Sequence, residues 1–545
     1  MHILHALEKD GHSAENLKLR GIAIAPLLGR LYDIIIDNRF CSWFNPNPEQ
    51  AAQAGQGCQL QTFALFLLIC YAKENSKNLF VGFLDFEKAF DFVNRAEVIS
   101  DLMKKNCGKN LTEAIAKMFA TSTYFPKLEG NRLGTGIETD YGVTQGRRSS
   151  GSIFTFYVSD MPNALKNLPT DDFMDPHNLA QLADDTAVLA EKTKNLSKKF
   201  KNVLSYSDDK YQSPNISKTL YCNFAAEPSF EPIVIDENTV INSVDKEKGY
   251  KYLGSTFIPT DDIALIIQKN IKKRLGNTAK FYSWLNVNET TPIQVKLMVL
   301  DSCMFSALIH GVECWGDIAF IEQQLIDIET KSLKAIMRVK KGTTNDLVYH
   351  ELRRGTITSK IRDRQFKFFQ KLTQLTEDQA MIAAIIKLCR NTSMMAYYRN
   401  LNDKNEERDI RERELRLQES ENSLSKYYSD FNFDQKSCIY TCMMNDHYRY
   451  ILTRWRLSNH DLKIETGRYL RPKPPREDRI CTRCNIMEDE YHVVFVCPVY
   501  ESLRERYRSL LECDNIATFL DPKFDDIRDT ASFLHEIEEL RKGSN

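Results

Sequence analysis

The sequence predicts an α+β fold, with a small β-sheet in the first half of the chain and helices in the second half. Two short apolar runs, 179–183 and 186–190, are joined by two adjacent acids and indicate a pair of strands with a turn between them. A third apolar run, 79–84, ends in an acid and changes to spaced apolar residues, which indicates a strand that passes into a helix. From about 261 to 400 the apolar residues recur with helical spacing.

Three acidic side chains stand at the ends of these predicted strands. Asp184 and Asp185 lie between the two paired runs, and Asp85 closes the run 79–84. Two like charges held together are costly unless a cation neutralises them. Three carboxylates at strand ends are what a pair of Mg²⁺ ions needs to act on a phosphoryl centre. An exposed acidic turn at 184–185 and a helix N-cap at Asp85 are the alternative interpretations.

Three further short motifs follow the first acid in the chain. Residues 142–146, GVTQG, precede the apolar run 153–158, which is expected to be a helix packed on the sheet. The glycines of this motif let the backbone approach a bulky partner, and Gln145 offers both a donor and an acceptor. The other two motifs are NISKT at 215–219 and YKYLG at 250–254.

The ordered set resembles the reverse transcriptase domain of non-LTR (LINE-like) retrotransposons. In that family a stretch like LDFEKAFD, residues 84–91 here, is followed by a GVxQG turn, an aromatic-Ala-Asp-Asp, an NxxKT stretch and a YLG hairpin. Residues 19–31 resemble the family's fingers segment, 53–55 the start of its QAGF stretch, and 308–315 its LxYGxExW thumb segment. The resemblance covers most of residues 19–370 and resumes near the C-terminus.

The resemblance implies a right-hand polymerase with an antiparallel palm sheet. Residues 403–420 are dense in Glu and Arg, which indicates an exposed charged helix. The domains expected are fingers and palm over 1–260, a helical thumb and its extension over 261–400, a charged helical connector over 401–447, a basic strip with a zinc-knuckle-like module over 448–512, and an acidic helical tail over 513–545.

The resemblance also implies the reaction. An RNA-directed DNA polymerase would add dNTPs to a DNA 3′-end along an RNA template. Asp85 and Asp184 would be the principal ligands of two Mg²⁺ ions, or Mn²⁺, with Asp185 adjacent. Catalysis would rest on positioning and on neutralising charge at the phosphoryl oxygens.

Four residues are implied to meet the substrates. Phe90 matches the bulky position that excludes a ribose 2′-hydroxyl, although an ordinary core-facing helix residue fits as well. Gln145 and Gly146 would pack near the template–dNTP pair. Lys218 resembles the basic residue near the leaving phosphates, with a solvated surface lysine as the alternative.

The chain departs from the family's pattern at three places. Leu182 stands where relatives commonly have an aromatic, Arg147-Arg148 where they commonly have Cys-Pro, and Gln56-Gly57 where they have Phe-Arg. None of these changes a carboxylate. Met1 lies close to the fingers segment, so we expect a truncated copy or a captured fragment, with the N-terminal endonuclease either lost or encoded upstream of the given start. The alternative function is an inactive, retroelement-derived nucleic-acid-binding protein; a group II intron maturase or a telomerase-like enzyme shares the palm pattern only.

A second motif lies near the C-terminus. Cys481, Cys484, His492 and Cys497 have the spacing C-x2-C-x7-H-x4-C, which is typical of tetrahedral Zn²⁺ sites with sulfur and nitrogen ligands. Four such ligands leave no open coordination position, so a structural role is expected. Residues 488–500 also resemble the zinc-knuckle region of many non-LTR elements.

Residues 449–483 form a basic strip, with ten Lys or Arg against four acids. Tyr450, Trp455 and Tyr469 are interleaved with the arginines. Arginines pair with phosphates and aromatic rings stack on bases, so the strip favours binding to single-stranded nucleic acid. A solvated linker whose rings belong to a neighbouring core is the alternative.

Composition sets the remaining bounds. The chain has 545 residues, 42% of them hydrophobic and 27% charged, as in an ordinary globular protein. Fourteen cysteines without repeated short spacing, and no signal peptide, indicate reduced thiols in the nucleus or cytoplasm rather than secretion. The apolar patch 62–70 is too short to span a bilayer, so no membrane partner is expected.

Overall fold

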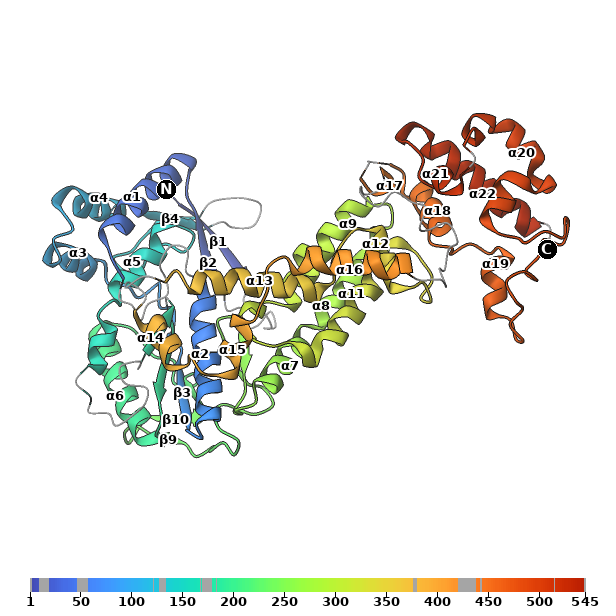
Figure 1. Ribbon diagram of the computed structural model, residues 1–545. Helices are drawn as coiled ribbons and strands as arrows, with labels where there is room; N and C mark the ends of the chain where they lie inside the picture. Colours follow the sequence, from blue (N-terminus) through green and yellow to red (C-terminus); the bar gives the residue numbers. More distant parts are fainter. Residues whose placement is uncertain are drawn as a thin grey trace. The chain divides into compact units, whose positions relative to one another are not determined.

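The computed structural model divides the chain into two compact units (Figure 1). Unit 1 comprises Met1–Asn270, Gly311–Asp317 and Phe368–Asn400, and unit 2 comprises Ile271–His310, Ile318–Lys367 and Leu401–Asn545. Strands and helices are both present, so the predicted α+β class is confirmed. The structure describes residues 2–8, 19–46, 57–120, 122–126, 134–166, 168, 179–182, 184–375, 380–419, 438–441, 444–513 and 515–543. The QAGF-like residues 53–55 lie outside these ranges.

A six-stranded sheet, the palm sheet, forms the centre of unit 1. Its central strand β3, Leu79–Leu84, is buried at every position, which explains why this run is apolar throughout. The order is β6-β7-β3-β8-β10-β9; β6 to β8 are antiparallel neighbours, as predicted, and β10 joins β8 in parallel. The other strands are β6 (Leu179–Leu182), β7 (Asp185–Ala190), β8 (Leu220–Phe224), β9 (Ile233–Val234) and β10 (Val240–Ser243).

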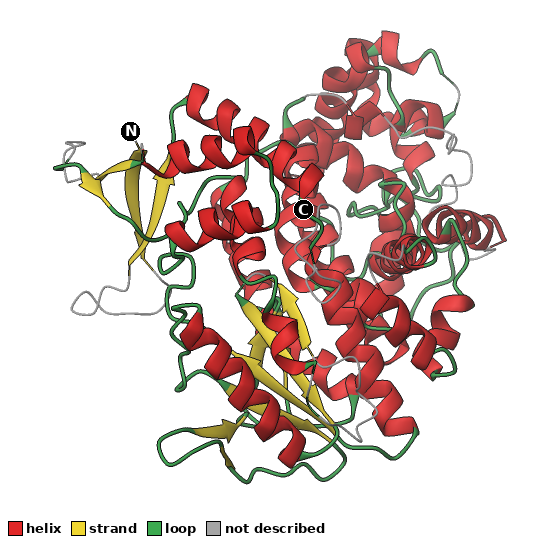
Figure 2. Cartoon of the chain, turned by 90° about the vertical axis from the view of Figure 1, so that its left-hand side faces the viewer, coloured by secondary structure: helices red, strands yellow, loops and turns green. Residues whose placement is uncertain are grey.

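Helix α6, Thr193–Asp209, covers one face of the palm sheet (Figure 2). The ring of Phe200 lies so close to Gly82 that a Cβ at this position would come 2.2 Å from the ring. Glycine in the middle of a strand is unfavourable in itself, and here it allows the close approach of the helix. The position therefore fixes how α6 packs on β3.

The opposite face of the sheet is covered by α2, Gly57–Glu74, and by a hairpin of β11, Tyr250–Tyr252, and β12, Ser255–Phe257. Phe83 of β3 stacks on Tyr250 with ring centroids 4.5 Å apart. The hairpin predicted from YLG is confirmed. Its turn residues Leu253 and Gly254 both have positive φ, 47° and 80°, as a two-residue hairpin turn requires.

A second, four-stranded sheet with the order β2-β1-β4-β5 lies near the N-terminus, beside helices that share a core with the palm sheet (Figure 2). The predicted helix at 153–158 is confirmed as α5, Ser149–Tyr157. Phe156 of α5 meets Phe40 of α1 edge to face, with ring centroids 5.7 Å apart. These elements are β1 (His2–Glu8), β2 (Leu19–Ile24), β4 (Thr123–Pro126), β5 (Ile137–Glu138), α1 (Leu27–Trp43), α3 (Arg95–Lys104) and α4 (Lys109–Ala120).

Helices dominate unit 2. Helix α16, Asn405–Glu419, occupies the stretch expected to be an exposed charged helix, yet its Arg413 is only 3% exposed. Arg413 pairs with Asp346 and Asp409 at 3.1 and 3.2 Å and lies over the ring of Tyr349. The expectation is therefore wrong for the inner side of this helix. The domain boundaries expected from the sequence stay predictions.

The C-terminal part of unit 2 packs around α18, Asp446–Arg456, and α22, Ile527–Gly543. Glu538 of α22 accepts hydrogen bonds from Trp455 Nε1 at 3.0 Å and from Arg454 at 3.1 Å. Among the described residues, we find no helix that is both long and apolar enough to cross a bilayer.

Candidate active site and candidate metal centre

The three acids meet at one edge of the palm sheet. Strand β3 pairs antiparallel with β7 in a register that sets Leu84 opposite Thr186. Asp85 follows Leu84 and Asp185 precedes Thr186, so the two acids lie side by side at the end of the ladder. Asp184 lies in the turn between β6 and β7. The structure brings the three acids to the ends of adjacent antiparallel strands, as predicted, although Asp85 and Asp184 lie just outside the strands. That the acids share two metal ions stays a prediction.

The charges of these acids act on one another. Burial, followed by the charges of Asp184 and Asp85, raises the pKa of Asp185 to about 6, while Lys251 opposes the shift. Asp185 keeps contact with solvent, so the crowding lies in an accessible site. An edge that resists ionisation of its third carboxylate has a deficit of positive charge, which divalent cations fit.

Asp85 is held by the 215–219 motif. Its backbone carbonyl accepts from the N–H of Asn215 at 2.7 Å, and its own N–H donates to Thr219 Oγ1 at 3.3 Å. Thr219 is fully buried. The sequence indicated Lys218 as the functional residue of this motif. It did not indicate that Asn215 and Thr219 bind the backbone of Asp85, because nothing in the motif shows which segment it contacts.

Asp85 is not a helix N-cap, and the strand does not pass directly into a helix. Residues 86–92 form a bend, with Lys88 at a positive φ of 48°. The next helix, α3, begins at Arg95, and its N-cap is Asn94, whose side chain accepts from the N–H groups of Ala96 and Glu97. The expectation that the strand passes directly into a helix and the alternative of an N-cap at Asp85 are therefore both wrong. The carboxylate of Asp85 caps no helix and lies at the candidate active site.

The GVTQG turn runs along the bend after Asp85. The N–H of Val143 donates to the carbonyl of Phe90 and that of Gly142 to the carbonyl of Val93, both at 2.8 Å. Gly142 has φ 85°, and a Cβ there would come 2.9 Å from the carbonyl oxygen of Asp91. The motif needs glycine at 142 because its backbone passes directly over the backbone of Asp91, where a side chain would not fit.

Phe90 and Gln145 therefore belong to neighbouring segments. Phe90 is half-buried and stacks on Phe154 of α5, with centroids 4.6 Å apart and the rings inclined by 20°. Part of its ring packs on the core, so the core-facing interpretation is confirmed for that part, although residue 90 lies in a turn and not in a helix. A contact of its exposed part with a substrate stays a prediction. Gln145 is half-buried, and Gly146 is exposed with φ 111°.

Lys218 lies beside the acids. Its Nζ is 3.3 Å from Asp85 Oδ2, and 60% of its side chain is exposed. The pair is too exposed to stabilise the fold strongly. It does place an exposed ammonium group at the edge of the site, where an anionic group could bind it.

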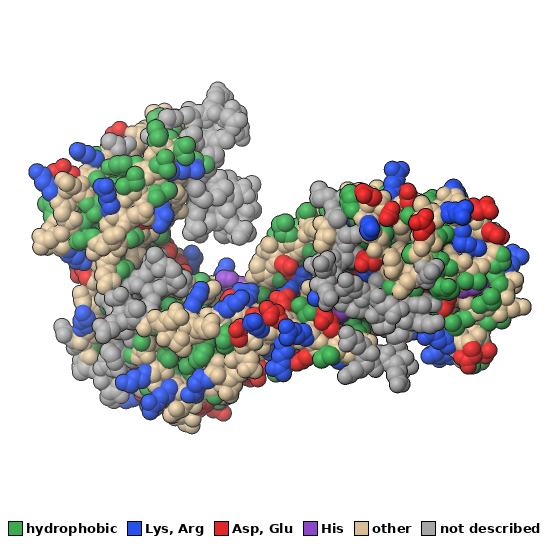
Figure 3. Space-filling model, turned by 45° about the horizontal axis from the view of Figure 1, so that its top comes forward, with side chains coloured by type: hydrophobic (Ala, Val, Ile, Leu, Met, Phe, Trp, Pro, Cys, Tyr) green, Lys and Arg blue, Asp and Glu red, His purple; other side chains and the backbone are tan. Residues whose placement is uncertain are grey.

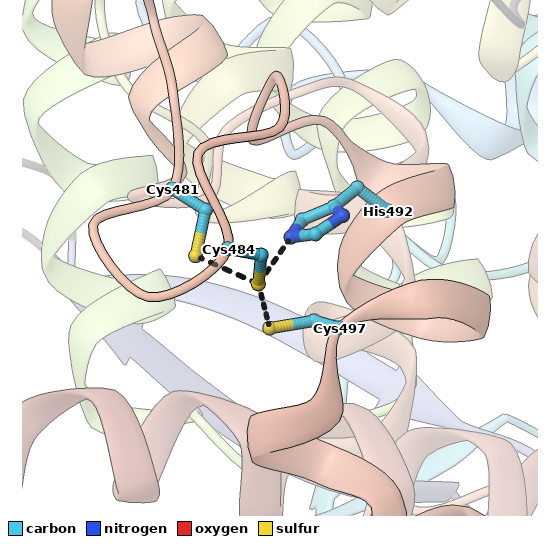
Figure 4. A group of neighbouring side chains, drawn as sticks. All are labelled: Cys481, Cys484, His492 and Cys497. Atoms are coloured by element: carbon cyan, nitrogen blue, oxygen red, sulfur yellow. Dashed lines mark hydrogen bonds between the residues drawn. The ribbon is translucent and has the colours of Figure 1, made fainter.

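Cys481, Cys484, His492 and Cys497 form a compact cluster in unit 2 (Figure 4). Their ligand atoms all lie within 4.8 Å of one another. Cys484 Sγ is 3.7 Å from Cys481 Sγ, 3.5 Å from Cys497 Sγ and 3.6 Å from His492 Nε2. Donors about 2.3 Å from a shared tetrahedral ion stand roughly 3.8 Å apart, so the spacing fits one metal ion.

The electrostatics of the cluster agree with a metal ligand set. Burial and the neighbouring thiols of Cys497 and Cys481 raise the pKa of Cys484 to about 12. Burial lowers the pKa of His492, which favours the neutral imidazole that binds metals. Three thiols this close cannot all ionise unless a cation lies between them.

The cluster is built from two short elements. The N–H of Cys481 donates to Ile486 O at 2.7 Å, and that of Asn485, at φ 55°, to Cys481 O at 3.0 Å, which closes the turn that carries the first two thiols. The one-turn helix His492–Val496 carries the imidazole, and Cys497 follows it directly. The predicted ligand set is thus brought together.

The basic strip does not face solvent as expected. Arg449, Tyr450, Trp455, Arg456 and Arg479 are all buried. Because Arg456 pairs with Glu351 and Trp455 donates to Glu538, these side chains serve the interior of unit 2. The visible face of unit 2 carries interspersed basic and acidic side chains (Figure 3). The expectation of an exposed strip is therefore wrong for these five residues. Of the alternative, the burial of the rings of Tyr450 and Trp455 in a core is confirmed, but the segment is helix α18 and not a solvated linker.

An exposed remainder of the strip lies in the segment 469–476, between the buried strip and the cysteine cluster. Tyr469 and Leu470 are 74% and 59% exposed. Arg471, Lys473 and Arg476 are exposed as well. We call this segment the basic loop.

Comparisons with known proteins agree with the palm. A family model described as "Reverse transcriptase (RNA-dependent DNA polymerase)" matches residues 8–257. Over 173 residues, 31% of this chain, the sequence is 28% identical to the retrovirus-related Pol polyprotein from the type-1 retrotransposable element R2 of Bradysia coprophila. The match spans 20% of that polyprotein's length.

Solved structures to which the chain shows some similarity include two telomerases, both in complex with a fragment of telomeric RNA. The Candida albicans enzyme is 11% identical, with 74% of this chain and 66% of that chain covered and a TM-score of 0.37. The Candida tropicalis enzyme is 14% identical, with 71% and 64% covered and a TM-score of 0.34.

The palm geometry, the family model and the R2 polyprotein agree on one assignment. Residues 8–257 match the reverse transcriptase (RNA-dependent DNA polymerase) family model, and part of the chain is similar to the Pol polyprotein of the retrotransposable element R2.

Proposed function

We propose that the chain extends a DNA 3′-end along an RNA template, with dNTPs and two Mg²⁺ ions. The observation that carries the proposal is the meeting of Asp85, Asp184 and Asp185 at one accessible edge of the palm sheet. Their crowding favours cations, and the reverse transcriptase family model spans this edge.

The residues around the acids have distinct roles in this reaction. When bound, two divalent cations neutralise charge on the attacking 3′-oxygen and on the leaving pyrophosphate. Asp85 and Asp184 would hold them, and Asp185 would complete the carboxylate set. Lys218, released from Asp85, would meet the leaving phosphates.

The sugar and the base pair are positioned by neighbouring segments. The ring of Phe90, supported from behind by Phe154, would leave no room for a ribose 2′-hydroxyl. Gln145 and Gly146 would lie against the template–dNTP pair, where a residue without a side chain lets backbone approach the bases.

The experiment is primer extension by the purified full chain on an RNA template with an annealed DNA primer. We expect extension that requires dNTPs and Mg²⁺, continues with Mn²⁺, and stops when a chelator is added. Absence of extension with retained RNA binding would instead support the alternative of an inactive nucleic-acid-binding protein.

We propose Zn²⁺ as the ion of the cysteine–histidine cluster, with a structural role. Three thiolates and one imidazole are a ligand set that Zn²⁺ takes in closed, four-coordinate sites. The cluster is tied to its surroundings by the acidic run before His492: Glu490 accepts from His460 Nε2 at 2.9 Å, and Glu488 pairs with Arg541 at 2.7 Å. The ion would hold the basic loop in place against RNA or DNA.

A further inference from the structure

Helix α5 begins without a capping side chain of its own. Its N-cap residue, Arg148, has helical backbone angles, φ −66° and ψ −43°, and its side chain caps none of the helix N–H groups. The first N–H groups of a helix have no partner within the helix, so another segment must accept from them.

Helix α1 supplies the acceptor. Asp33 Oδ2 accepts from the N–H of Arg148 at 2.8 Å and from that of Ser149 at 3.4 Å, and its Oδ1 accepts from the Ser149 hydroxyl. Asp33 is only 3% exposed. A buried carboxylate at a helix N-terminus also interacts favourably with the helix dipole.

A second acid of α1 reinforces the contact. Asp37 lies one helical turn after Asp33 and is also 3% exposed. Its Oδ2 accepts from Arg148 Nε at 2.8 Å, and its Oδ1 accepts from Ser152 Oγ at 2.7 Å. The two carboxylates thus clamp the first turn of α5 from one face of α1.

The clamped residues directly follow the turn that carries Gln145 and Gly146. The carbonyl of Gln145 accepts from the N–H of Ala23 at 2.8 Å, and Ser150 Oγ donates to the carbonyl of Thr144 at 2.6 Å. The turn is therefore fixed before Gly146 by β2 and after it by α1. Gly146, at φ 111°, has a wide range of allowed backbone angles, so the turn needs both of these contacts to keep one conformation.

We propose that Asp33 is a positioning residue, which holds the Gln145–Gly146 turn in register against the template–nucleotide pair. The inference rests on the proposed function of the palm. Arg148 has an N–H group that needs an acceptor at the start of α5. A proline has no N–H and has its φ fixed near −65°, so its helix start needs no acceptor there. With Arg148, the acceptor is needed, and Asp33 provides it.

The test is steady-state primer extension on an RNA template by full-length variants, with KM for dNTP and kcat measured separately. For Asp33→Ala we expect KM to rise by about tenfold or more, with a smaller fall in kcat, because a misplaced binding element costs on the order of 10- to 100-fold. Asp33→Asn keeps one acceptor oxygen and should lie between Asp33→Ala and wild type. Asn38→Ala, on the exposed side of α1, is the control and should change neither constant.

The decisive arm is rescue by proline. In the Asp33→Ala background, Arg148→Pro should lower the raised KM part of the way back to the wild-type value. Proline removes the N–H group that lost its acceptor, and its fixed φ matches the φ of residue 148. General weakening of α1 would not be repaired by a change at position 148. An unchanged KM in Asp33→Ala, or a double variant no better than the single one, would overturn the inference. An inactive wild-type protein would overturn the proposed function instead.

Discussion

At the scale of single residues, the site depends on three carboxylates that disfavour one another's charge. The raised pKa of Asp185 follows from burial and from two neighbouring acids at the same sheet edge. The ionised form of such a group is disfavoured in the metal-free protein and is favoured beside a cation. The protonation of Asp185 should therefore affect the stability of the metal-free protein, and its ionised form should favour metal binding.

The pH dependence of stability in chelator should reveal Asp185. Its carboxyl has an ordinary pKa of 3.8 when unfolded and about 6 when folded, so the folded state binds more protons between these values. Stability from this group is present below about pH 4 and is lost as the pH rises through 6. Asp185→Asn should therefore gain in thermal midpoint over wild type as the pH rises from 4 to 7. A difference that stays constant across this range would contradict the assigned shift.

Phe90 should set sugar selectivity. Phe90→Ala removes the ring that we propose lies beside the substrate sugar, and it should lower the preference for dNTPs over rNTPs, measured as the ratio of kcat/KM values. Phe156→Leu, which removes a buried ring of α5 that packs on Phe40, is the control: it should lower the thermal midpoint and leave the ratio near the wild-type value. An unchanged ratio in Phe90→Ala would make Phe90 a core residue only.

At the scale of elements, local patterns predicted some features and missed others. The strands beside Asp184, the YLG hairpin and α5 were predictable, because alternation, turn residues and apolar runs are local signals. The bend after Asp85 was not predictable, because its glycine contact at Gly142 and its bonds to 215–219 come from distant segments. Net charge likewise could not show which arginines of the basic strip pair inside unit 2.

Two arginines of the basic strip should behave in opposite ways. Arg456 and Glu351 are buried partners, so Arg456→Ala should lower the free energy of unfolding by about 3–5 kcal/mol, since it leaves a buried carboxylate unpaired. Arg471→Ala, in the exposed basic loop, should change stability by about 0.5 kcal/mol or less. Denaturant unfolding measures both.

RNA binding separates the same pair of variants. Arg471→Ala should weaken binding to single-stranded RNA and reduce its salt dependence, as loss of a phosphate contact does. Arg456→Ala should bind as wild type does, at temperatures where it stays folded. Wild-type RNA affinity in Arg471→Ala would exclude a role for this residue of the basic loop.

The cysteine cluster should bind one Zn²⁺ per chain. Cys484→Ser should lose the ion, measured by metal analysis of the full-length protein, and should weaken RNA binding. Primer extension at saturating template should persist, because the cluster and the palm belong to different compact units. Cys513→Ser, at a cysteine outside the cluster, is the control and should retain the metal. A full-length wild-type protein without zinc would contradict the assignment.

At the scale of the whole molecule, each unit contains one site that the sequence could predict. The palm's acids and the C-x2-C-x7-H-x4-C ligands were predictable, because each set lies in short motifs with fixed spacing. The clamp of α5 by Asp33 and Asp37 was not, because more than a hundred residues separate the partners. Sequence spacing carries no signal for such contacts. The departures at Arg147 and Arg148 marked the place without indicating the partner.

The most direct test of the central claim is Mg²⁺-dependent primer extension by Asp184→Asn beside wild type. Asparagine keeps the shape of the side chain and removes the charge that a metal needs. We predict RNA-templated extension by wild type, no detectable extension by Asp184→Asn, and equal binding of both proteins to the primer–template. Extension by Asp184→Asn at the wild-type rate would contradict the two-metal palm and the function proposed for this chain.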